Sequence, residues 1–272
     1  MIRQILVPLM LGRAEADAAR YACALAEPFA AAVDVVVGMS AVSPIVAGWD
    51  YYPAGVFDTL DEATRAASEA LAGEVHRALA DTGDQASVRV SGAFWMTPGE
   101  QALQHAQTAD LVVLARPAAP TDADRALFAS LLLGAGRPIL VTPPDALRKP
   151  PRRIAVAWNG TREAVRALHD ALPLLRAADH VEALHVVGGE AQAAIDGALL
   201  PHLDRHRVHA VLETLPRHDR AVADALMAHA LDTRADLLVA GGYGHARVME
   251  QVFGGTTHAL FHHSPVPVLF SH

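Results

Sequence analysis

The sequence predicts an α/β fold made of two tandem units, each an open, Rossmann-like sheet of five parallel strands, related by an internal repeat and joined as a pseudo-dimer. Three observations carry this prediction. Short apolar runs alternate with longer helical patterns, which is typical of parallel strand-helix units. A proline-rich segment divides the 272-residue chain near its middle. Strand-like segments before that division recur after it.

The first half opens on strand, helix, strand, which begins a parallel sheet. Its second strand carries the run VDVVV at residues 33–37, which suits a strand buried on both faces. The alternation of strand and helix patterns continues to the end of this half. The expected strands are 4–9, 32–39, 86–90, 110–115 and 138–142, and the expected helices are about 13–29, 60–80, 98–107 and 122–133.

The division of the chain lies between Pro143 and Pro151, where two proline pairs cannot enter a sheet interior and favour an extended connector. We therefore predict one domain at residues 1–144 and a second at residues 151–272. The segments that match across this division are 109–114 with 235–240, 137–142 with 265–270, and 4–9 with 152–157. The first two pairs are offset by 126 and 128 residues.

The third pair, which matches the first strands, is offset by about 149 residues. This exceeds the other two offsets by about 22, so the first half carries about 22 extra residues between its first and fourth strands. We assign this surplus to an aromatic segment from Trp49 to Phe57, interpreted as an insertion. Two interpretations of the insertion remain open. It covers an apolar sheet edge or the seam between domains, or it forms a lid or partner surface, because Tyr and Trp suit interfaces that are dry on one side and wet on the other.

Composition excludes several classes of protein. With 52% hydrophobic and 19% charged residues and no apolar run of about 18 residues, we expect a soluble, cytoplasmic protein without a membrane segment or export signal. A net charge of −8 argues against nucleic-acid binding. The single cysteine, Cys23, precludes a disulfide within the chain, and the single lysine, Lys149, lies in the connector, away from any candidate site for lysine chemistry.

A glycine-rich turn in the second half is the main candidate for function. Strand 235–240 runs into Gly241, Gly242, Tyr243 and Gly244, and a helix start is expected near Gly254. Glycines at the carboxyl end of a strand let the backbone approach a ligand, and amides at a helix start can hold phosphate oxygens. The alternative is an ordinary strand-to-helix connection whose glycines only close a tight turn.

The expected ligand site lies beyond the carboxyl ends of the strands, where strand order reverses. This rule brings the segment 158–161 beside the glycine turn. We expect Asn159 to offer an acceptor and a donor to a base or ribose, while amides near residues 254–257 hold phosphates. The candidate nucleotide-binding residues are Ala157, Trp158, Asn159, Val186, Ala240, Gly241, Gly244, Gly254, Gly255, Thr256 and Thr257.

These residues resemble the universal stress protein family, whose members often occur as tandem two-domain chains. Nucleotide-binding members carry a glycine, two residues, a glycine, nine residues, a glycine and then Ser or Thr. Gly241, Gly244 and Gly254 have this spacing. The resemblance implies that the C-terminal domain binds an adenine nucleotide, ATP with Mg²⁺.

Two positions depart from the family pattern. Gly255 stands where the hydroxyl residue is expected, and Asn159 replaces the acidic residue that follows the first strand. Thr257 matches a second hydroxyl position of the ATP-binding members, and Gly160-Thr161 is similar to their Gly-Ser. Losing one hydroxyl contact to a phosphate costs about 1 to 3 kcal/mol, which weakens binding without preventing it.

The first half departs further, so we expect its nucleotide site to be degenerate. Met10 stands where the acidic residue would be, and the turn after the fourth strand reads ARPA at residues 115–118. The resemblance also implies that the last strands of the two domains pair. Pro138, Pro265 and Pro267 fit edge positions, where a missing backbone donor is tolerated.

No catalytic residue is assigned, because neither a Gly-x-Ser-x-Gly elbow nor a Ser-Gly-Gly-x-Asp loop occurs. Several of the 15 histidines are spaced to share a metal. His202 and His206 lie four apart with His209 nearby, and His258 and His262 repeat the spacing. No cysteine or carboxylate is placed as a further ligand, so we expect solvated helix faces and no metal.

We therefore predict a stress-response or signalling protein that binds ATP, rather than a turnover enzyme. His245 and Arg247 would face either a phosphate or solvent. One alternative is a nucleotide-free scaffold with the same fold, and another is a slow ATP hydrolase. The expected partners are an adenine nucleotide, an unidentified protein and a second copy of the chain in a homodimer.

Overall fold

The computed structural model describes residues 1–11, 16–39, 54–93, 95–146, 148–187, 196–217, 219–243 and 255–272. Strands and helices alternate along it as the apolar patterns predict. The strands are β1 (Gln4–Leu9), β2 (Ala32–Gly38), β3 (Ala86–Ser91), β4 (Leu111–Ala115), β5 (Ile139–Thr142), β6 (Arg153–Ala157), β7 (His180–Val187), β8 (Ala210–Pro216), β9 (Leu237–Gly241) and β10 (Val268–Ser271). The α-helices are α1 (Ala16–Ala26), α2 (Ala54–Ala78), α3 (Pro98–Ala106), α4 (Asp122–Gly134), α5 (Arg162–Ala177), α6 (Leu199–Arg205), α7 (Val222–Asp232) and α8 (Gly255–His263).

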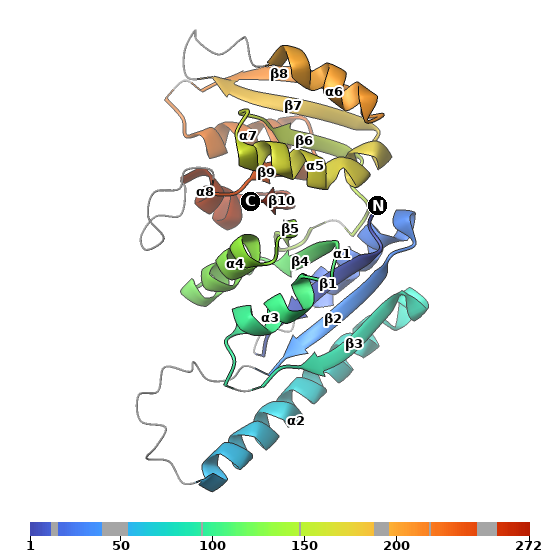
Figure 1. The fold of residues 1–272 in the computed structure, drawn as a ribbon, viewed down its shortest axis with the longest axis vertical. Helices are drawn as coiled ribbons and strands as arrows, with labels where there is room; N and C mark the ends of the chain where they lie inside the picture. Colours follow the sequence, from blue (N-terminus) through green and yellow to red (C-terminus); the bar gives the residue numbers. More distant parts are fainter. Residues whose placement is uncertain are drawn as a thin grey trace.

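The strands form one ten-stranded sheet in the order β3-β2-β1-β4-β5-β10-β9-β6-β7-β8 (Figure 1). All pairs within each half are parallel, and β5 pairs with β10 in antiparallel fashion, with Val141 opposite Val268 and Ile139 opposite Phe270. The second half therefore repeats the first in mirrored order about this central pair. This confirms the predicted two five-stranded units and their joining through the last strands. The exact domain bounds near residues 144 and 151 stay a prediction.

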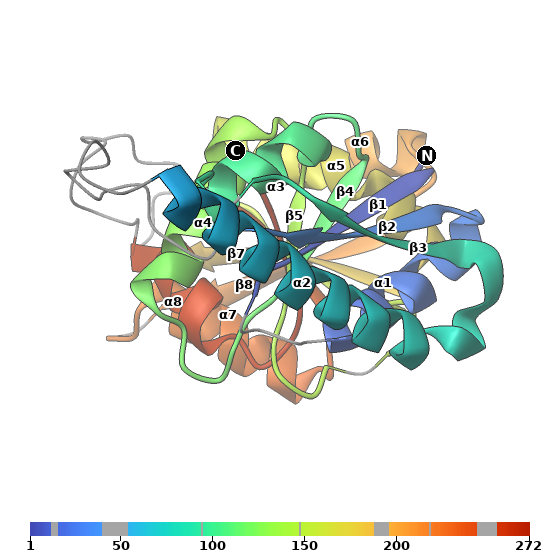
Figure 2. The same cartoon turned by 90° about the horizontal axis from the view of Figure 1, so that it is seen from below.

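Helices cover both faces of the sheet (Figure 2). One core cluster gathers buried side chains from α1, α2, α5 and α6, and the other gathers them from α3, α4, α7 and α8. Each cluster includes strand residues from both halves, because alternate residues of a strand point to opposite faces. The two halves therefore share both cores across the β5-β10 pair.

The prolines near the last strands have a different role from the predicted one. The paired β5 and β10 lie in the middle of the sheet, so neither is an edge in the folded chain. Pro138 and Pro267 each precede the first residue of the strand, and their carbonyls accept from Val112 N at 3.1 Å and Leu238 N at 2.9 Å. A proline at the start of a strand contributes its acceptor without leaving a missing donor inside the ladder.

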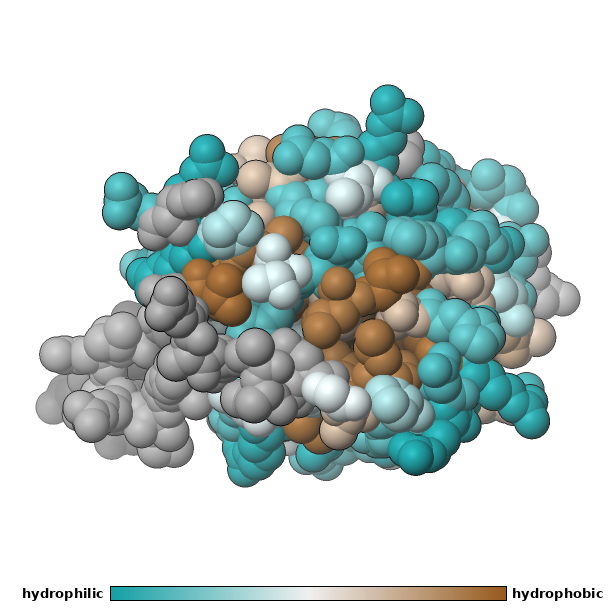
Figure 3. All heavy atoms as spheres, turned by 90° about the horizontal axis from the view of Figure 1, so that it is seen from above, coloured by the Kyte–Doolittle hydropathy of each residue, from teal (hydrophilic) through white to brown (hydrophobic). Residues whose placement is uncertain are grey.

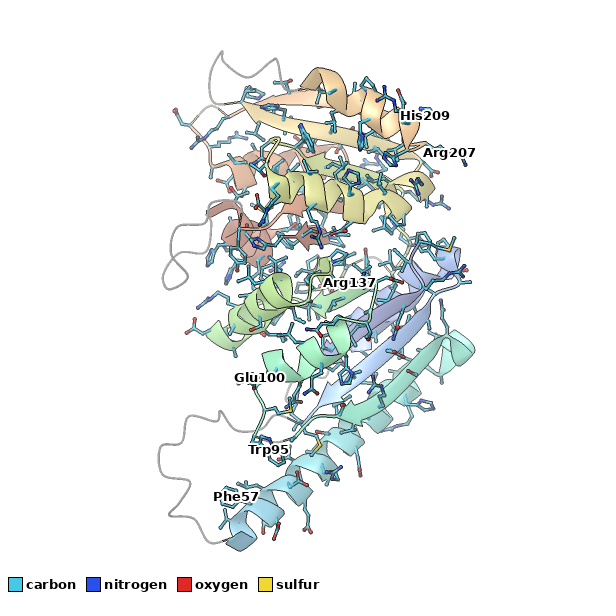
Figure 4. The ribbon with its side chains drawn as sticks, in the orientation of Figure 1. Phe57, Trp95, Glu100, Arg137, Arg207 and His209 are labelled. Atoms are coloured by element: carbon cyan, nitrogen blue, oxygen red, sulfur yellow. The ribbon has the colours of Figure 1, made fainter. Side chains whose placement is uncertain are left out.

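Helix α2 starts earlier than predicted. It begins at Ala54 rather than near residue 60, so Phe57 belongs to the helix and not to an irregular insertion (Figure 4). Residues 40–53, which hold the rest of the aromatic segment, lie outside the described residues. Whether that segment acts as a cover or as a lid stays a prediction.

Strands β3 and β8 form the two outer edges of the sheet. Figure 3 views the β8 end, where hydrophobic side chains gather within a largely hydrophilic surface. Val211 on β8 is 45% exposed. The predicted homodimer stays a prediction. Among the described helices, none combines the length and hydropathy needed to cross a membrane.

Candidate functional site

A cavity of about 230 Å³ lies at the carboxyl ends of β6 and β9. The start of α5, strand β7, helix α7 and the start of α8 complete its walls. This is the place where the strand order of the C-terminal half reverses, as sheet topology predicts. Its lining consists of Ala157, Trp158, Asn159, Thr161, Glu163, Ala164, Leu184, Val186, Val222, Leu226, Ala240, Gly241, Gly255, Thr256 and Thr257.

Nine of the eleven residues that the sequence assigned to a nucleotide site line this cavity. The other two, Gly244 and Gly254, lie outside the described residues, as do His245 and Arg247. Sequence reasoning did not assign six lining residues, among them Leu184 and four residues of helices α5 and α7. Leu184 precedes Val186 by two positions on β7, so strand alternation was a signal that pointed to it.

The inner wall of the cavity is apolar. Leu184 from β7 and Leu226 from α7 are buried, and Val186 and Val222 are half-buried beside them. Ala157 is the last residue of β6 and Ala240 is the last but one of β9, and their small side chains leave the hollow between them. A wall of this kind suits a flat, apolar group such as a nucleobase.

The side-chain oxygen of Asn159 is used within its own loop. Its Oδ1 accepts from the backbone N of Thr161 at 3.2 Å and from the Thr161 hydroxyl at 2.8 Å. The Thr161 hydroxyl in turn accepts from Ala164 N at 3.3 Å and caps α5. The acceptor of Asn159 therefore holds the loop that starts α5. That Asn159 serves a base or ribose stays a prediction.

Glu163 is an acidic residue of the cavity that the sequence did not predict. It is 8% exposed. Burial alone would raise the pKa of its carboxyl group. Its own backbone N–H, Arg162 Nε at 3.1 Å and the charge of His272 outweigh burial and hold the pKa below its ordinary value. Glu163 therefore stays ionised and paired with Arg162 at the edge of the cavity. A carboxylate there can hold a hard cation such as Mg²⁺.

The mouth of the cavity meets the N-terminus of helix α8, which begins at Gly255. The first backbone N–H groups of a helix have no partner within the helix and attract anions. Thr257 is 4% exposed, and its hydroxyl accepts from Tyr243 N at 3.1 Å, so it ties α8 to the turn after β9. The hydroxyl proton of Thr257 can still be donated to a ligand oxygen.

The glycines after β9 allow close packing inside the protein. A Cβ on Gly241 would lie 2.7 Å from Ala164 N, so this glycine lets the start of α5 approach the strand. A Cβ on Gly242 would lie 2.6 Å from Leu132 Cδ2 on α4 of the other half. Gly241 also lines the cavity, so it serves helix packing, and its predicted role in approaching a ligand stays a prediction.

The equivalent place in the N-terminal half is nearly filled. The hollow beside Leu9 and Met10 measures about 20 Å³. The side chain of Gln101, the fourth residue of α3, occupies this region and is buried. Its Oε1 accepts from Met39 N at 2.9 Å, and its Nε2 donates to Ala93 O at 3.0 Å.

Arg116 follows β4 where Gly242 follows β9. Its guanidinium crosses to the other half, where Nη1 donates to His262 O at 2.5 Å and Nη2 donates to Ser264 O at 2.9 Å. These carbonyls lie at the carboxyl end of α8, where a cation is favoured by the helix dipole. The side chain that departs from the family's phosphate turn therefore binds the two halves together.

Comparison with known sequences gives one family. The profile of the Universal stress protein family matches residues 151–272. No curated protein sequence matches the chain.

Comparison with solved structures covers both halves. A universal stress protein from Archaeoglobus fulgidus is similar with a TM-score of 0.74 and 15% identity, over 98% of this chain and 95% of that one. A Pseudomonas aeruginosa protein described as functionally unknown is similar with a TM-score of 0.63 and 17% identity, over 99% and 92%. The cytoplasmic domain of a prokaryotic cation chloride cotransporter is similar with a TM-score of 0.53 and 12% identity, over 99% of this chain and 95% of that one. At such identities the likeness shows the tandem fold alone.

Proposed function

Because residues 151–272 form a domain of the universal stress protein family, we propose that the cavity beside Asn159 binds an adenine nucleotide, ATP with Mg²⁺. The protein would act as a nucleotide-responsive stress or signalling module. No residue is given a catalytic role, because among the described lining residues no nucleophile is hydrogen-bonded to a base.

The observation that carries this proposal is the pairing of an apolar hollow with a helix N-terminus at its mouth. The volume of about 230 Å³ is below the range of about 300 to 1,000 Å³ that is usual for pockets of whole drug-sized ligands. A base and ribose would therefore fill the hollow. The phosphates would lie outside it, against the first amides of α8, and Glu163, which also lines the cavity, would help to hold Mg²⁺.

Gly255 offers a direct test, because a Cβ there would meet no atom of the described residues within 4 Å. Substitutions at this position should therefore leave the fold intact. We expect Gly255→Ser, which adds a hydroxyl group at the phosphate end, to tighten ATP binding about tenfold. Gly255→Asp should weaken binding by at least about tenfold, because a carboxylate would repel the phosphates. Gly255→Ala should bind as the natural protein does.

Isothermal titration of ATP with Mg²⁺ into the four proteins measures these differences. Melting temperatures without nucleotide provide the folding control, and Gly255→Asp should be no less stable than the natural protein, since a negative charge is favoured at a helix N-terminus. Equal affinities in all four proteins would place the nucleotide elsewhere. No binding at millimolar ATP, even for Gly255→Ser, would contradict the proposal.

A nucleotide-free scaffold is the second candidate. Two observations favour it: the acceptor of Asn159 is used within its own loop, and residue 255 has no hydroxyl group. Native mass spectrometry of the protein purified from cells distinguishes the two functions. A co-purified adenine nucleotide argues against the scaffold, and the bare mass of the chain favours it.

A further inference from the structure

Three histidines gather between helices α5 and α6, away from the residues that line the cavity. His169 comes from α5, His202 from α6, and His206 directly follows the last residue of α6. One ring nitrogen from each lies within 4.8 Å of those of the other two. We propose that His169, His202 and His206 form a binding site for a divalent transition-metal ion, with Zn²⁺ as the ion that fits best.

The arrangement of the rings agrees with coordination of a single ion. The ring centroids of His169 and His202 are 5.1 Å apart, those of His169 and His206 are 5.7 Å apart, and those of His202 and His206 are 4.6 Å apart. With a Zn–N bond of about 2.0 to 2.1 Å, each imidazole centroid lies about 3.2 Å from the metal, and tetrahedral angles separate two centroids by about 5.2 Å. The three observed separations bracket this value.

The two helices hold the rings in place before any ion arrives. His202 and His206 lie four residues apart and so share one face of the α6 turn. Leu199 and Leu203 of α6 are buried in the same core cluster as Leu168 of α5, next to His169. Arg176 Nε donates to the carbonyl oxygen of His206 at 2.8 Å and fixes the end of α6 to α5. A site on rigid elements loses little entropy when it binds.

His202 has a buried ring nitrogen that can take an ion as its partner. Its Nε2 is buried and has no hydrogen-bond partner within the described part of the chain. A neutral imidazole is the form that binds metals, and an ion would give this buried nitrogen the partner that it lacks.

The ligand set restricts the choice of metal. Among the described residues no fourth histidine, cysteine or carboxylate joins the group, so water would complete the coordination. Imidazole nitrogens suit Zn²⁺, Cu²⁺, Ni²⁺ and Co²⁺, whereas Mg²⁺ and Ca²⁺ prefer oxygen ligands.

Arg176 Nη2 lies 3.3 Å from His206 Nδ1, and it would move aside as the ion binds a nitrogen of that ring. The nearby arginines oppose a cation, so we expect micromolar rather than nanomolar affinity.

Titration of Zn²⁺ into the metal-free full-length protein at pH 7.5 tests the site. We expect one ion for each chain, bound with micromolar affinity. His169→Gln and His202→Gln should each weaken that binding by at least about tenfold. Two matched controls should not. His209→Gln removes a nearby histidine that is 94% exposed at the outer end of the C-terminal half (Figure 4), and His258→Gln breaks the other pair with a spacing of four.

Co²⁺ provides a second readout, because its visible absorption reports coordination geometry directly. The natural protein and both controls should show the absorption of a low-coordinate Co²⁺ ion, and the two cluster variants should not. The proposal is overturned if the natural protein binds no Zn²⁺ at 100 µM, a concentration about a hundredfold above the expected Kd. It is also overturned if all four variants bind alike, or if the controls lose as much affinity as the cluster variants. Circular dichroism confirms that each variant is folded.

Discussion

The two halves of the molecule share one arrangement at the amino ends of their strands, which we call the shared frame: an aspartate before the fourth strand accepts hydrogen bonds from the start of the first. Asp110, just before β4, accepts from Arg3 N at 2.7 Å and Gln4 N at 3.1 Å. Asp236, just before β9, does the same for the start of β6, accepting from the N atoms of residues 152 and 153 at 3.0 Å each. In both halves, therefore, a carboxylate fixes the first strand against the fourth.

The halves differ at the carboxyl ends of the same strands. The cavity in the C-terminal half measures about 230 Å³, and its counterpart measures about 20 Å³. Gln101 is the fourth residue of α3, and Ala225 is the fourth residue of α7. One half places a hydrogen-bonded amide where the other has a methyl group. The fold therefore depends on one end of the strands, while the capacity for a ligand depends on a few side chains at the other.

Arg116 and Gly242 extend this comparison, because their backbone N atoms make equivalent bonds of 2.8 Å to Thr142 O and Ser271 O. At this position of the N-terminal half, Arg116 donates hydrogen bonds to the C-terminal half. At the same position of the C-terminal half, Leu132 of the N-terminal half packs against Gly242. The same site in the repeat has become a contact between the halves in both copies. The turn after the fourth strand therefore helps to hold the two halves together in both copies.

The largest effect is expected from Arg116→Ala. It removes two charge-assisted hydrogen bonds and leaves the carbonyl groups of His262 and Ser264 without these partners. We expect the free energy of unfolding to fall by about 2 to 4 kcal/mol, measured by urea denaturation. Arg148→Ala is the matched control, because its ion pair with Asp17 is exposed and should contribute under about 1 kcal/mol. Equal effects of the two substitutions would contradict the role given to Arg116.

An exchange at the two helix positions tests the comparison of the cavities. Ala225 precedes Leu226, which lines the cavity, so Ala225→Gln should crowd the C-terminal hollow and weaken ATP binding by at least about tenfold, because the base loses space. Gln101→Ala should lower the free energy of unfolding by about 1 to 3 kcal/mol, because Met39 N loses its acceptor inside the protein.

The exchange is measured by ATP titration and by urea denaturation of each variant. Gln101→Ala should not create a second ATP site, because Arg116 still occupies the turn beside it. Two bound nucleotides per chain in Gln101→Ala would show that the amide alone blocks the N-terminal half. Unchanged ATP affinity in Ala225→Gln would show that α7 does not limit the cavity.

The smallest effect concerns the shared frame. Asp110→Asn and Asp236→Asn should each cost about 1 kcal/mol, since each loses charge-assisted bonds to two backbone N–H groups. Asp236 also pairs with Lys149 Nζ at 2.8 Å, but Lys149 is half exposed and adds little. The two losses should therefore agree within about 0.5 kcal/mol. A much larger loss at Asp236 would mean that the connector contributes more than the frame.

The pH dependence of this effect has a defined sign. Burial alone would raise the pKa of Asp236, but the hydrogen bond from Lys149 and those from two backbone N–H groups outweigh it and hold the pKa below the ordinary value of 3.8. A lowered folded-state pKa stabilises the protein above the unfolded pKa, and this stability is lost as pH falls through the folded-state value. The stability difference between the natural protein and Asp236→Asn should therefore shrink below about pH 4. A constant difference from pH 7 to pH 3 would contradict this assignment.

Much of the fold could be predicted from the sequence, because strands and helices depend largely on the local periodicity of apolar residues. The run at residues 33–37 gave a buried strand, and the repeated segments gave two units joined by their last strands. The start of α2 was missed, because Gly55 and the aromatic residues around it break the helical pattern locally while the helix begins at Ala54. Helix termini depend on packing as well as on propensity.

The candidate site was predictable only in part. Spacing identified residues such as Ala157 and Thr257, because the carboxyl ends of parallel strands meet at one edge of the sheet. Spacing gave no sign that Asn159 would hold its own loop or that Gly241 would serve the packing of α5. A glycine at this position is expected both where the backbone approaches a ligand and where a helix packs closely, so the sequence does not distinguish the two.

By itself the sequence determined the duplicated architecture and the edge of the sheet where a ligand would lie, because periodicity and chain direction are local properties. Only the tertiary structure decided that Gln101 fills one hollow, that Arg116 crosses to the other half and that His169 joins His202 and His206. Each of these contacts joins residues that are far apart along the chain. They exist because packing brings helices together at distances that no sequence spacing specifies.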